Sequence, residues 1–442
     1  MNPNPYIKTN FPGPNTKKWL EGSAEWVCGR SQDLVVSEEK GVYVTDVDGN
    51  IYLDFTGAGQ TNNIGYSHPR VIDAIKEQAD KGITPLSSLR LRIELAQRII
   101  KISPGELARG KVAFCTTGSD ATEFAIKMVR SVYPGRTGLF ALQGAYHGSY
   151  LGGLSVTMDN SQLRRYCLGA LQPSAYAPFA YCYRCSFGQE FPGCGYPCVE
   201  YIKYVLDTVA PPEEMAAFFV EPIQAHAGNI VPPEGFLSKV KRICEQNKIL
   251  LVDDEVVTGF GRTGKMWGIE NWIIEPDIML LGKPIAAGLP LAAIVGKREI
   301  MDRWVPELHL RTAFAGNPVS CSAALASINV IEQEQLLENS AKVGNYMMKR
   351  LKEMAEEYEF IGDVRGKGLL IGVELVKDRR TKEPAPDLVR MTIEKARDKS
   401  LLLYAGGTYR QTIRFSPPLS LTTDEAEKGL NILEEAFREV GV

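Results

Sequence analysis

The sequence lacks an excess of charge of either sign. Its 442 residues include 50 lysines and arginines against 53 aspartates and glutamates, a formal net charge of −3. Proteins that bind nucleic acids or anionic membranes through their surface charge usually carry a basic excess. The balance gives no electrostatic reason for either partner, and we therefore expect neither a nucleic acid nor a membrane to take part in the function.

Long uninterrupted hydrophobic runs are also missing, although one stretch comes near. Residues 278–296, IMLLGKPIAAGLPLAAIVG, contain two prolines, several glycines and Lys283, and KRE follows them directly. These features make the stretch a poor membrane span. The first residues, MNPNPYIKTNFPGPNTKKW, have no apolar core of the kind that a secretory signal needs. We therefore expect a cytoplasmic protein.

Lys283 is the only charged residue of that apolar stretch. A charged ammonium in such surroundings is costly unless it is paired or loses its proton. A desolvated, neutral lysine amine is a nucleophile. We therefore interpret Lys283 as a candidate catalytic residue.

The nine cysteines fall into two groups. Five are scattered and fit buried thiols in a reducing compartment: Cys28, Cys115, Cys167, Cys244 and Cys321. Four lie within YCYRCSFGQEFPGCGYPC: Cys182, Cys185, Cys194 and Cys198. The CxxC spacing of the first pair suits a structural zinc, while a local disulfide and free thiols are the alternatives. The sequence leaves these three open, and we assign no metal to the chemistry.

Helical patterns alternate with short apolar runs from about residue 68 to 320. HPRVIDAIKEQADK (68–81) is typical of a helix, and ILLVDDEV (249–256) is typical of a buried strand. This alternation predicts an α/β fold with a mostly parallel sheet and helices on both faces.

The pattern changes after about residue 325. A long helix over 322–355, the strand-like GLLIGVELV and a helix over 386–399 predict a second, α+β domain. Near the start of the chain, GVYVTDVDGNIYLDFT alternates apolar and polar residues around DGN, as hairpins do. We predict a large domain over 68–325 and a small domain over 326–442, which an N-terminal segment over 1–67 joins.

Three acidic residues follow the apolar run ILLV: Asp253, Asp254 and Glu255. In open α/β sheets the carboxyl ends of the strands are where ligands bind. The loop that follows contains GFGRTGKM, which is close to the phosphate-binding loop of ATPases. We reject that interpretation, because Met266 replaces the hydroxyl that would hold magnesium and no apolar strand directly precedes the loop.

Two other segments suit a phosphorylated, planar ligand. In CTTGSDATEFAIK, Gly118 and Ser119 stand where a strand passes into a helix, and free N–H groups at a helix start bind phosphate; an ordinary helix cap is the alternative. In GAYHGSY, Tyr146 can stack on a flat ring or belong to the core. Together with Lys283 and a buried carboxylate, these parts fit pyridoxal phosphate, whose aldehyde takes a lysine and whose ring nitrogen needs an acid.

Six segments, in family order, resemble the class III aminotransferases, a family of fold type I pyridoxal-phosphate enzymes: GSDATEFAIKMVR, AYHG, VEPIQ, VDDEVVTGFGRTGKMWG, PDIMLLGKPIAAGLPLAAI and AGNPVSCSAAL. The resemblance runs from about residue 40 to the C-terminus. It implies the fold type I transferase architecture, pyridoxal 5′-phosphate as cofactor, and a homodimer or higher homo-oligomer with active sites at the subunit interface. FIGDVRGKGLLIGVELVKDRRTKEPA is similar to a branch that holds dialkylglycine decarboxylase and amino-acid racemases and epimerases.

The resemblance implies a role for each residue that matches a motif. Lys283 would form the Schiff base with the cofactor, and Asp254 would pair with its pyridinium nitrogen. Val256 and Tyr146 would lie against opposite faces of the ring. The remaining contacts would come from Gly118 and Ser119 to the phosphate, Gln224 near the phenolic oxygen and Arg414 to the substrate carboxylate.

Three positions depart from the family pattern, and one further region is assigned only by analogy. Val257 stands where many members have glutamine. Where a threonine of the partner subunit would reach the phosphate, this chain has Ala313, with Thr312 one residue earlier. Residues 59–61, in TGAGQTNN, would line the substrate pocket.

The third departure is His226, in EPIQAHAG. Family members that transfer terminal amino groups have a glutamate here, which can pair with the carboxylate-binding arginine and switch it off. His226 cannot neutralise Arg414, which favours an α-amino acid as the substrate. Racemase-like members place an acid at this position, and racemisation needs one base on each face of the carbanion. His226 is therefore either a second base, because its pKa lies near neutrality, or a residue that only shapes the pocket.

The resemblance implies an enzyme that acts at the α-carbon of an α-amino acid. Our first hypothesis is an aminotransferase that passes the amino group to a 2-oxo acid, because most family members do so. The second is a racemase or epimerase with Lys283 and His226 as the two bases, and the third is decarboxylation-dependent transamination. The choice depends on which bond to the α-carbon stands perpendicular to the cofactor ring, and the sequence does not set that angle.

Overall fold

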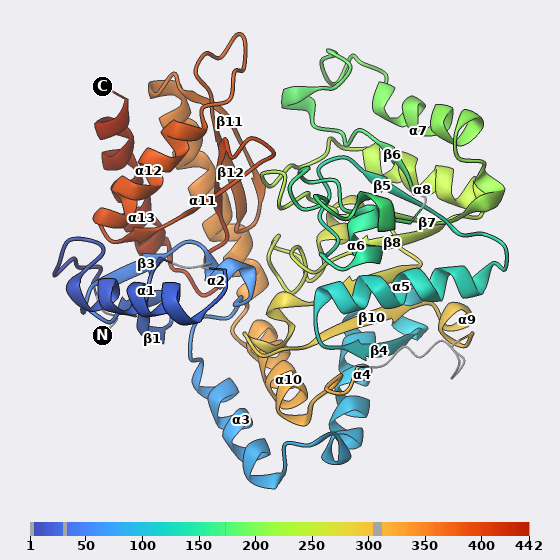
Figure 1. Ribbon diagram of the computed structural model, residues 1–442, viewed down its shortest axis with the longest axis horizontal. Helices are drawn as coiled ribbons and strands as arrows, with labels where there is room; N and C mark the ends of the chain where they lie inside the picture. Colours follow the sequence, from blue (N-terminus) through green and yellow to red (C-terminus); the bar gives the residue numbers. More distant parts are fainter. Residues whose placement is uncertain (1–3, 30–32, 173, 304–311, 442) are drawn as a thin grey trace.

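A seven-stranded sheet forms the centre of the larger part of the computed structural model, which describes residues 4–29, 33–172, 174–303 and 312–441 (Figure 1). The strand order is β4-β10-β9-β8-β7-β5-β6, and only β10 runs antiparallel to its neighbours. The strands are β4 (Lys111–Cys115), β5 (Gly138–Leu142), β6 (Ser174–Ala177), β7 (Met215–Val220), β8 (Leu250–Asp254), β9 (Ile278–Leu281) and β10 (Ala292–Gly296). The predicted α/β fold with a mostly parallel sheet is confirmed.

Both faces of this sheet are buried, which explains why its strands are apolar runs without polar alternation. In β8, Leu250 and Val252 belong to a core cluster with α5 (Gly118–Val132), while Leu251 belongs to the cluster that contains the apolar side of α8 (Phe236–Asn247). Successive side chains of a strand point to opposite faces. The helices therefore sandwich the sheet, and the strand ends are left to carry the polar side chains.

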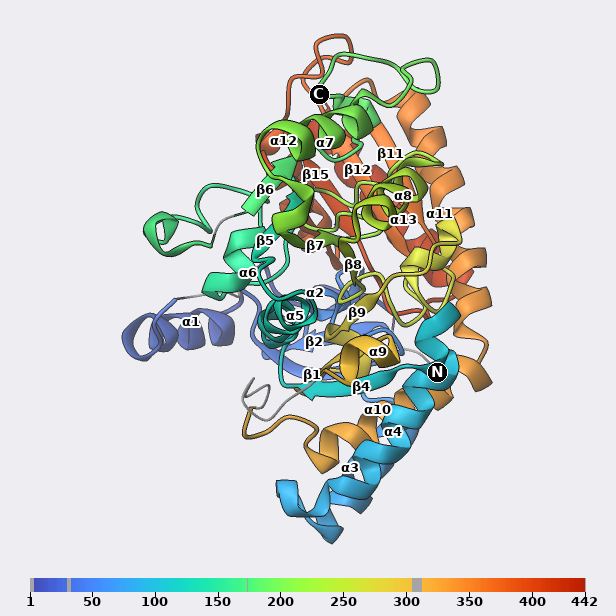
Figure 2. The same ribbon diagram turned by 90° about the vertical axis from the view of Figure 1, so that its right-hand side faces the viewer.

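The other helices belong partly to this sheet and partly to the small sheets described below. They are α1 (Pro14–Trp26), α2 (Gly57–Gln60), α3 (Pro69–Lys81), α4 (Leu89–Ile102), α6 (Leu151–Val156), α7 (Pro197–Thr208), α9 (Arg298–Met301), α10 (Pro318–Gln333), α11 (Leu336–Glu357), α12 (Pro386–Asp398) and α13 (Thr423–Val440). Figure 2 shows α3, α4 and α10 grouped together beyond β4.

The prediction of one long helix over 322–355 is wrong, because the chain forms two helices there, α10 and α11. Gln335, between them, has φ +53°, a left-handed conformation that a helix cannot contain. The break lets the two helices pack against different partners. α10 contacts α3 and α4, whereas α11 packs on α13 and on strand β11 (Ile361–Lys367).

Two four-stranded sheets complete the structure. One has the order β11-β12-β15-β14, with β12 (Leu370–Leu375), β14 (Tyr404–Gly406) and β15 (Thr412–Phe415). The other has the order β1-β2-β3-β13, with β1 (Val36–Lys40), β2 (Tyr43–Asp46), β3 (Ile51–Asp54) and β13 (Leu401–Leu402). The predicted hairpin is confirmed, because β2 and β3 pair antiparallel with Val44 opposite Tyr52.

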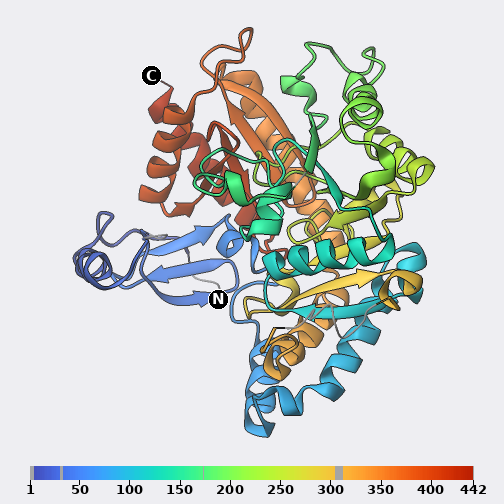
Figure 3. The ribbon, with the colours of Figure 1, turned by 45° about the vertical axis from the view of Figure 1, so that its right-hand side comes forward.

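The N-terminal strands lie beside the C-terminal helices, whereas α3, which follows them in the sequence, lies apart with α4 and α10 (Figures 1 and 3). The link is a parallel pairing in which Leu53 of β3 stands opposite Leu401 of β13. We propose on this basis that the segment over 1–67 joins the small domain, with the boundaries at 68 and 326 remaining predictions.

No helix in the described part of the chain combines the length and apolar character needed to cross a membrane. The apolar stretch that contains Lys283 instead forms β9, a short 3₁₀ turn over Lys283–Ala286 and β10.

Candidate active site

Three parallel strands bring the predicted residues to one edge of the sheet. β9 ends just before Lys283, β8 ends at Asp254, and β7 leads into the loop that carries His226. Because β8 lies between β9 and β7, Lys283 and His226 approach from opposite sides of the strand that holds Asp254. This arrangement follows the rule that ligands bind at the carboxyl ends of parallel strands.

Lys283 lies in a cavity of about 870 Å³ at this edge. Its backbone has φ +39°, a left-handed conformation forced where the strand turns into the 3₁₀ helix. Its amine donates one hydrogen bond, to Oε1 of Gln60 at 3.3 Å. Burial, with a further contribution from the cationic Arg414, lowers the pKa of Lys283 to about 8. The amine is therefore poised to act as a neutral nucleophile near physiological pH.

Asp254 is buried and its carboxylate is held by two donors. Oδ2 lies 2.8 Å from Nδ1 of His147, and Oδ1 accepts a hydrogen bond of 3.1 Å from the backbone N–H of Val256. His147 stands in the AYHG motif, and the sequence alone indicates no role for it. It fixes the orientation of the carboxylate, as the partners of catalytic groups commonly do.

The two acids beside Asp254 belong to the opposite face of the sheet. Glu255 accepts hydrogen bonds from the hydroxyl of Thr258 and from the N–H groups of Gly268 and Ile269. Burial, with the neighbouring Glu255, raises the pKa of Asp253 well above its ordinary value. Of the DDE run, only the middle acid therefore points to the face of the sheet that carries His147.

The start of α5 has the geometry of a phosphate seat. Thr117 caps the helix in a reciprocal pair with Asp120, so the alternative of an ordinary cap is also realised. The N–H groups of Gly118 and Ser119, in the first turn, have no acceptor within the helix. A Cβ on Gly118 would lie only 3.2 Å from the methyl groups of Val256, so glycine allows the helix to approach this side chain.

Tyr146 and His226 form a stacked pair, with ring centroids 4.1 Å apart and planes 8° from parallel. The buried Glu221, for which the sequence alone indicates no role, links the two loops, because it accepts hydrogen bonds from the backbone N–H groups of Tyr146 and Ala225. Burial raises the pKa of Glu221 to about 7. Gln224 is also buried and donates from Nε2 to the carbonyl of Gln143 at 3.0 Å.

Arg414 lies on β15, in the sheet of order β11-β12-β15-β14, and its side chain lines the same cavity. Its Nε donates to Asn229 at 3.3 Å and its guanidinium carbon lies 4.6 Å from the centre of the Tyr404 ring. Nη2 is buried without a hydrogen-bond partner, and no acidic side chain of the described residues pairs with this arginine. A buried donor without a partner is costly, so this edge of the guanidinium is suited to an anionic ligand.

The remaining predicted residues are the segment 59–61 and Thr312. Gly59 and Gln60 line the cavity, whereas Thr61 is not among the residues that do. The hydroxyl of Thr312 lies 2.7 Å from that of Thr116. The structure therefore shows this threonine next to the start of α5 in its own chain.

The model of the family described as aminotransferase class-III matches residues 27–437. The match covers nearly the whole chain, including every element of the cavity. The chain belongs to the class III aminotransferase family. Its fold is that of the fold type I transferases, and the family resemblance read from the motifs is confirmed.

Relatives within this family have two kinds of activity. A leucine/methionine racemase of Thermococcus litoralis is 42% identical over 411 residues, which is 92% of this chain and 91% of the relative. A 5-aminovalerate aminotransferase of Pseudomonas aeruginosa is 36% identical over 417 residues, 93% of this chain and 95% of the relative. Among solved structures, an amine transaminase from an uncultivated Pseudomonas species in its PLP-bound form has a TM-score of 0.85 and 34% identity, covering 94% of this chain and 98% of its own.

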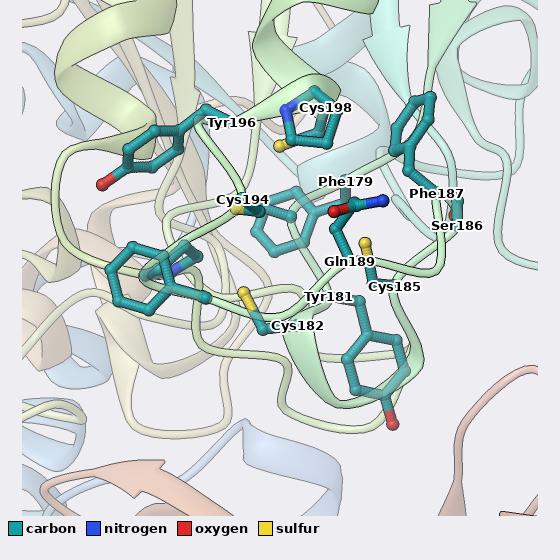
Figure 4. A pocket seen from close by; sticks show the side chains of 14 residues that line it. Phe179, Tyr181, Cys182, Cys185, Ser186, Phe187, Gln189, Cys194, Tyr196 and Cys198 are labelled. Carbon is teal, nitrogen blue, oxygen red and sulfur yellow. The ribbon is translucent and has the colours of Figure 1, made fainter.

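The cysteines lie apart from this cavity. All nine are free thiols, and Cys28, which we predicted to be buried, is exposed. Cys182, Cys185, Cys194 and Cys198 surround a small pocket of about 20 Å³ together with Phe179 and Tyr196 (Figure 4). Among the described residues, no three His, Cys, Asp or Glu side chains are arranged to hold a metal ion. Of the three alternatives for this segment, the structure contains free thiols.

Proposed function

We propose that the cavity holds pyridoxal phosphate through the residues that the family motifs indicate. As a class III family member, the protein is an enzyme that depends on this cofactor. Lys283 would bind the aldehyde, Asp254 the ring nitrogen, Gly118 and Ser119 the phosphate. The other contacts would come from Tyr146, Val256, Gln224 and Thr312. The lysine amine with its lowered pKa, the oriented carboxylate and the glycine at the helix start fit the group.

We further propose that the reaction is racemisation or epimerisation of an α-amino acid. The observation that carries this proposal is that Lys283 and His226, two groups able to carry protons, line the same cavity. Arg414, which has no acidic partner among the described residues, lines it too. Burial, together with the charges of Lys283 and Arg414, lowers the pKa of His226, so the imidazole is neutral and able to accept a proton at neutral pH. The similarity to a racemase at 42% identity supports the same choice.

In this reaction Arg414 would bind the substrate, and Lys283 and His226 would move protons. Arg414 binds the α-carboxylate and so fixes the α-carbon between the two bases. Lys283 moves a proton on one face of that carbon, and His226 moves a proton on the other. When bound, pyridoxal phosphate supplies the electron sink that makes the α-proton acidic.

Transamination to a 2-oxo acid is the second candidate. The similarity to an aminotransferase at 36% identity favours it, and it needs Lys283 alone as the proton carrier. In that reaction His226 would only shape the pocket. The geometry of the cavity moves racemisation ahead of transamination, the reverse of the order suggested by the sequence.

The test is to incubate the purified holoenzyme with single L-amino acids, with and without a 2-oxo acid, and to separate the products by chiral chromatography. We expect D-isomer to form without any 2-oxo acid. His226→Ala should lower racemisation at least about 100-fold, the size of a lost acid–base group. Exchange of the α-hydrogen with D₂O should persist for the enantiomer whose proton Lys283 removes and disappear for the other.

The matched control is His68→Ala, because His68 lies outside the cavity and pairs with Glu334. This variant should racemise as the unmodified enzyme does. Amino transfer only in the presence of a 2-oxo acid, with no D-isomer in its absence, would select the aminotransferase. Equal loss of both hydrogen exchanges in His226→Ala would remove His226 as the second base.

We also propose a homodimer with the active site near the subunit interface. Exposed apolar side chains gather around the start of α4, namely Leu86, Leu89 and Ile93, and the segment that carries the exposed Phe314 lies against Arg92 of the same helix. Monomers rarely expose such patches. Light scattering of the purified protein should give about twice the 48.8 kDa mass of the chain, and a monomeric mass would contradict the proposal.

A further inference from the structure

Asp159 is a buried carboxylate that reaches His226 from a distant part of the chain. It follows α6 in the sequence, and only 8% of its side chain is exposed. Its Oδ2 lies 3.6 Å from Nδ1 of His226, and it accepts a hydrogen bond of 3.0 Å from Nδ2 of Asn160. In the described part of the chain, no lysine or arginine forms an ion pair with this carboxylate. His226 is therefore its cationic partner whenever the imidazole is protonated.

Two further contacts position His226, one on its ring and one on its backbone. Tyr146 stacks on one face of the ring, and the carbonyl of His226 accepts a hydrogen bond of 2.9 Å from the N–H of Gly407. A ring fixed in this way presents Nδ1 to Asp159. When Nδ1 carries the proton, Nε2 keeps its lone pair and can act as a base.

Most of the surroundings of His226 disfavour its protonated form, and Asp159 is the group that favours it. Burial, Lys283 and Arg414 all lower its pKa, while Asp159 raises it. A base that cannot stabilise its protonated form takes a proton poorly. Asp159 is the carboxylate that compensates, and it does so without entering the contacts of the other catalytic groups.

We propose that Asp159 is the positioning residue of the second base, holding the Nδ1–H tautomer of His226 and stabilising the imidazolium that forms when Nε2 takes a proton. This inference rests on the proposed racemisation. The separation of 3.6 Å is longer than a closed hydrogen bond, and such separations between catalytic groups commonly shorten when substrate binds.

Racemisation removes one proton from the α-carbon and returns another to its opposite face. The proton of the Cα–H bond moves to Nε2 of His226, and the electron pair of that bond remains with the substrate. Lys283 delivers a different proton to the opposite face of the α-carbon, which gives the other enantiomer. The reverse reaction exchanges the two roles, and both side chains return to their starting states by exchanging protons with solvent. The charge formed on His226 is balanced by Asp159 throughout.

The first measurement is the titration of His226 in the holoenzyme, followed by NMR of histidine labelled with ¹³C at ε1. The chain contains four histidines, so the His226→Ala spectrum identifies the signal. Because a carboxylate within a few ångströms stabilises the imidazolium, we expect Asp159→Asn to lower the pKa of His226 by about one unit. Asp159→Glu, which keeps the charge, should recover most of that shift.

The second measurement is α-hydrogen exchange in D₂O, taken separately for each enantiomer. Asp159→Asn should slow the exchange that His226→Ala abolishes by about 10-fold or more, and should move its rising pH limb to lower pH, because the base now has a lower pKa. The exchange that Lys283 performs provides an internal control for folding and cofactor binding. Asp207→Asn, an exposed carboxylate on α7, is the matched variant that should change neither rate.

The outcomes separate the inference from the proposed function. If His226→Ala abolishes one exchange but Asp159→Asn leaves the His226 pKa and both pH profiles unchanged, the role of Asp159 is overturned while racemisation stands. Equal slowing of both exchanges in Asp159→Asn, with no change in the pKa, would reduce Asp159 to a structural residue. If His226→Ala leaves both exchanges intact, the proposed second base itself is wrong.

Discussion

Replacement of Lys283 by alanine is expected to lower turnover roughly 10⁵-fold or more, as removal of the nucleophile does in other enzymes. The amine has one weak hydrogen bond, to Gln60, and a pKa lowered to about 8. No other lysine lines the described cavity, so no neighbouring amine can take over.

The direct readout of this prediction is covalent. Borohydride treatment of the holoenzyme, followed by peptide mapping, should attach the reduced cofactor to the peptide that contains Lys283, and the Lys283→Ala enzyme should show no labelled peptide. Lys349→Ala, an exposed position on α11, should behave as the unmodified enzyme. A label on any other lysine would remove the assignment on which the proposed function depends.

Replacement of Asp254 by asparagine is expected to cost about 10⁴-fold in turnover, the size seen when a buried carboxylate partner of a catalytic group is neutralised. Asp254 would hold a proton on the ring nitrogen, and asparagine has the same shape without the charge. His147 and the N–H of Val256 keep the side chain in its present orientation. We therefore expect the variant to retain its cofactor, measured by absorbance after dialysis, while turnover falls.

Asp253→Asn is a closely matched control for this experiment. Asp253 is the preceding residue of β8 and is fully buried, but it points to the other face of the sheet. Because burial and Glu255 raise its pKa well above the ordinary value, the neutral form of this carboxyl is favoured, and asparagine changes the charge here less than it does at Asp254. Turnover should change by less than about threefold. A similar large loss in both variants would mean that the effect of Asp254→Asn comes from disturbed packing.

Local patterns were sufficient for much of the fold. The apolar runs that end in Asp254 and just before Lys283 are strands of the central sheet, and the hairpin around DGN forms as predicted. These elements are determined by side-chain periodicity, which is a property of neighbouring residues. The break between α10 and α11 was missed, because a left-handed Gln335 in an otherwise helical pattern has no strong local signal.

The sequence by itself determined the lysine, the carboxylate and the family, because a charged residue in an apolar run and an acid at a strand end are visible in one dimension. Only the tertiary structure decided which groups surround His226. Asp159, Tyr146 and Arg414 come from three separate segments, and the pKa of a partly buried imidazole depends on the charges that folding brings near it. The positions of these residues in the sequence do not set their distances from His226, so the support for a second base comes from the tertiary structure.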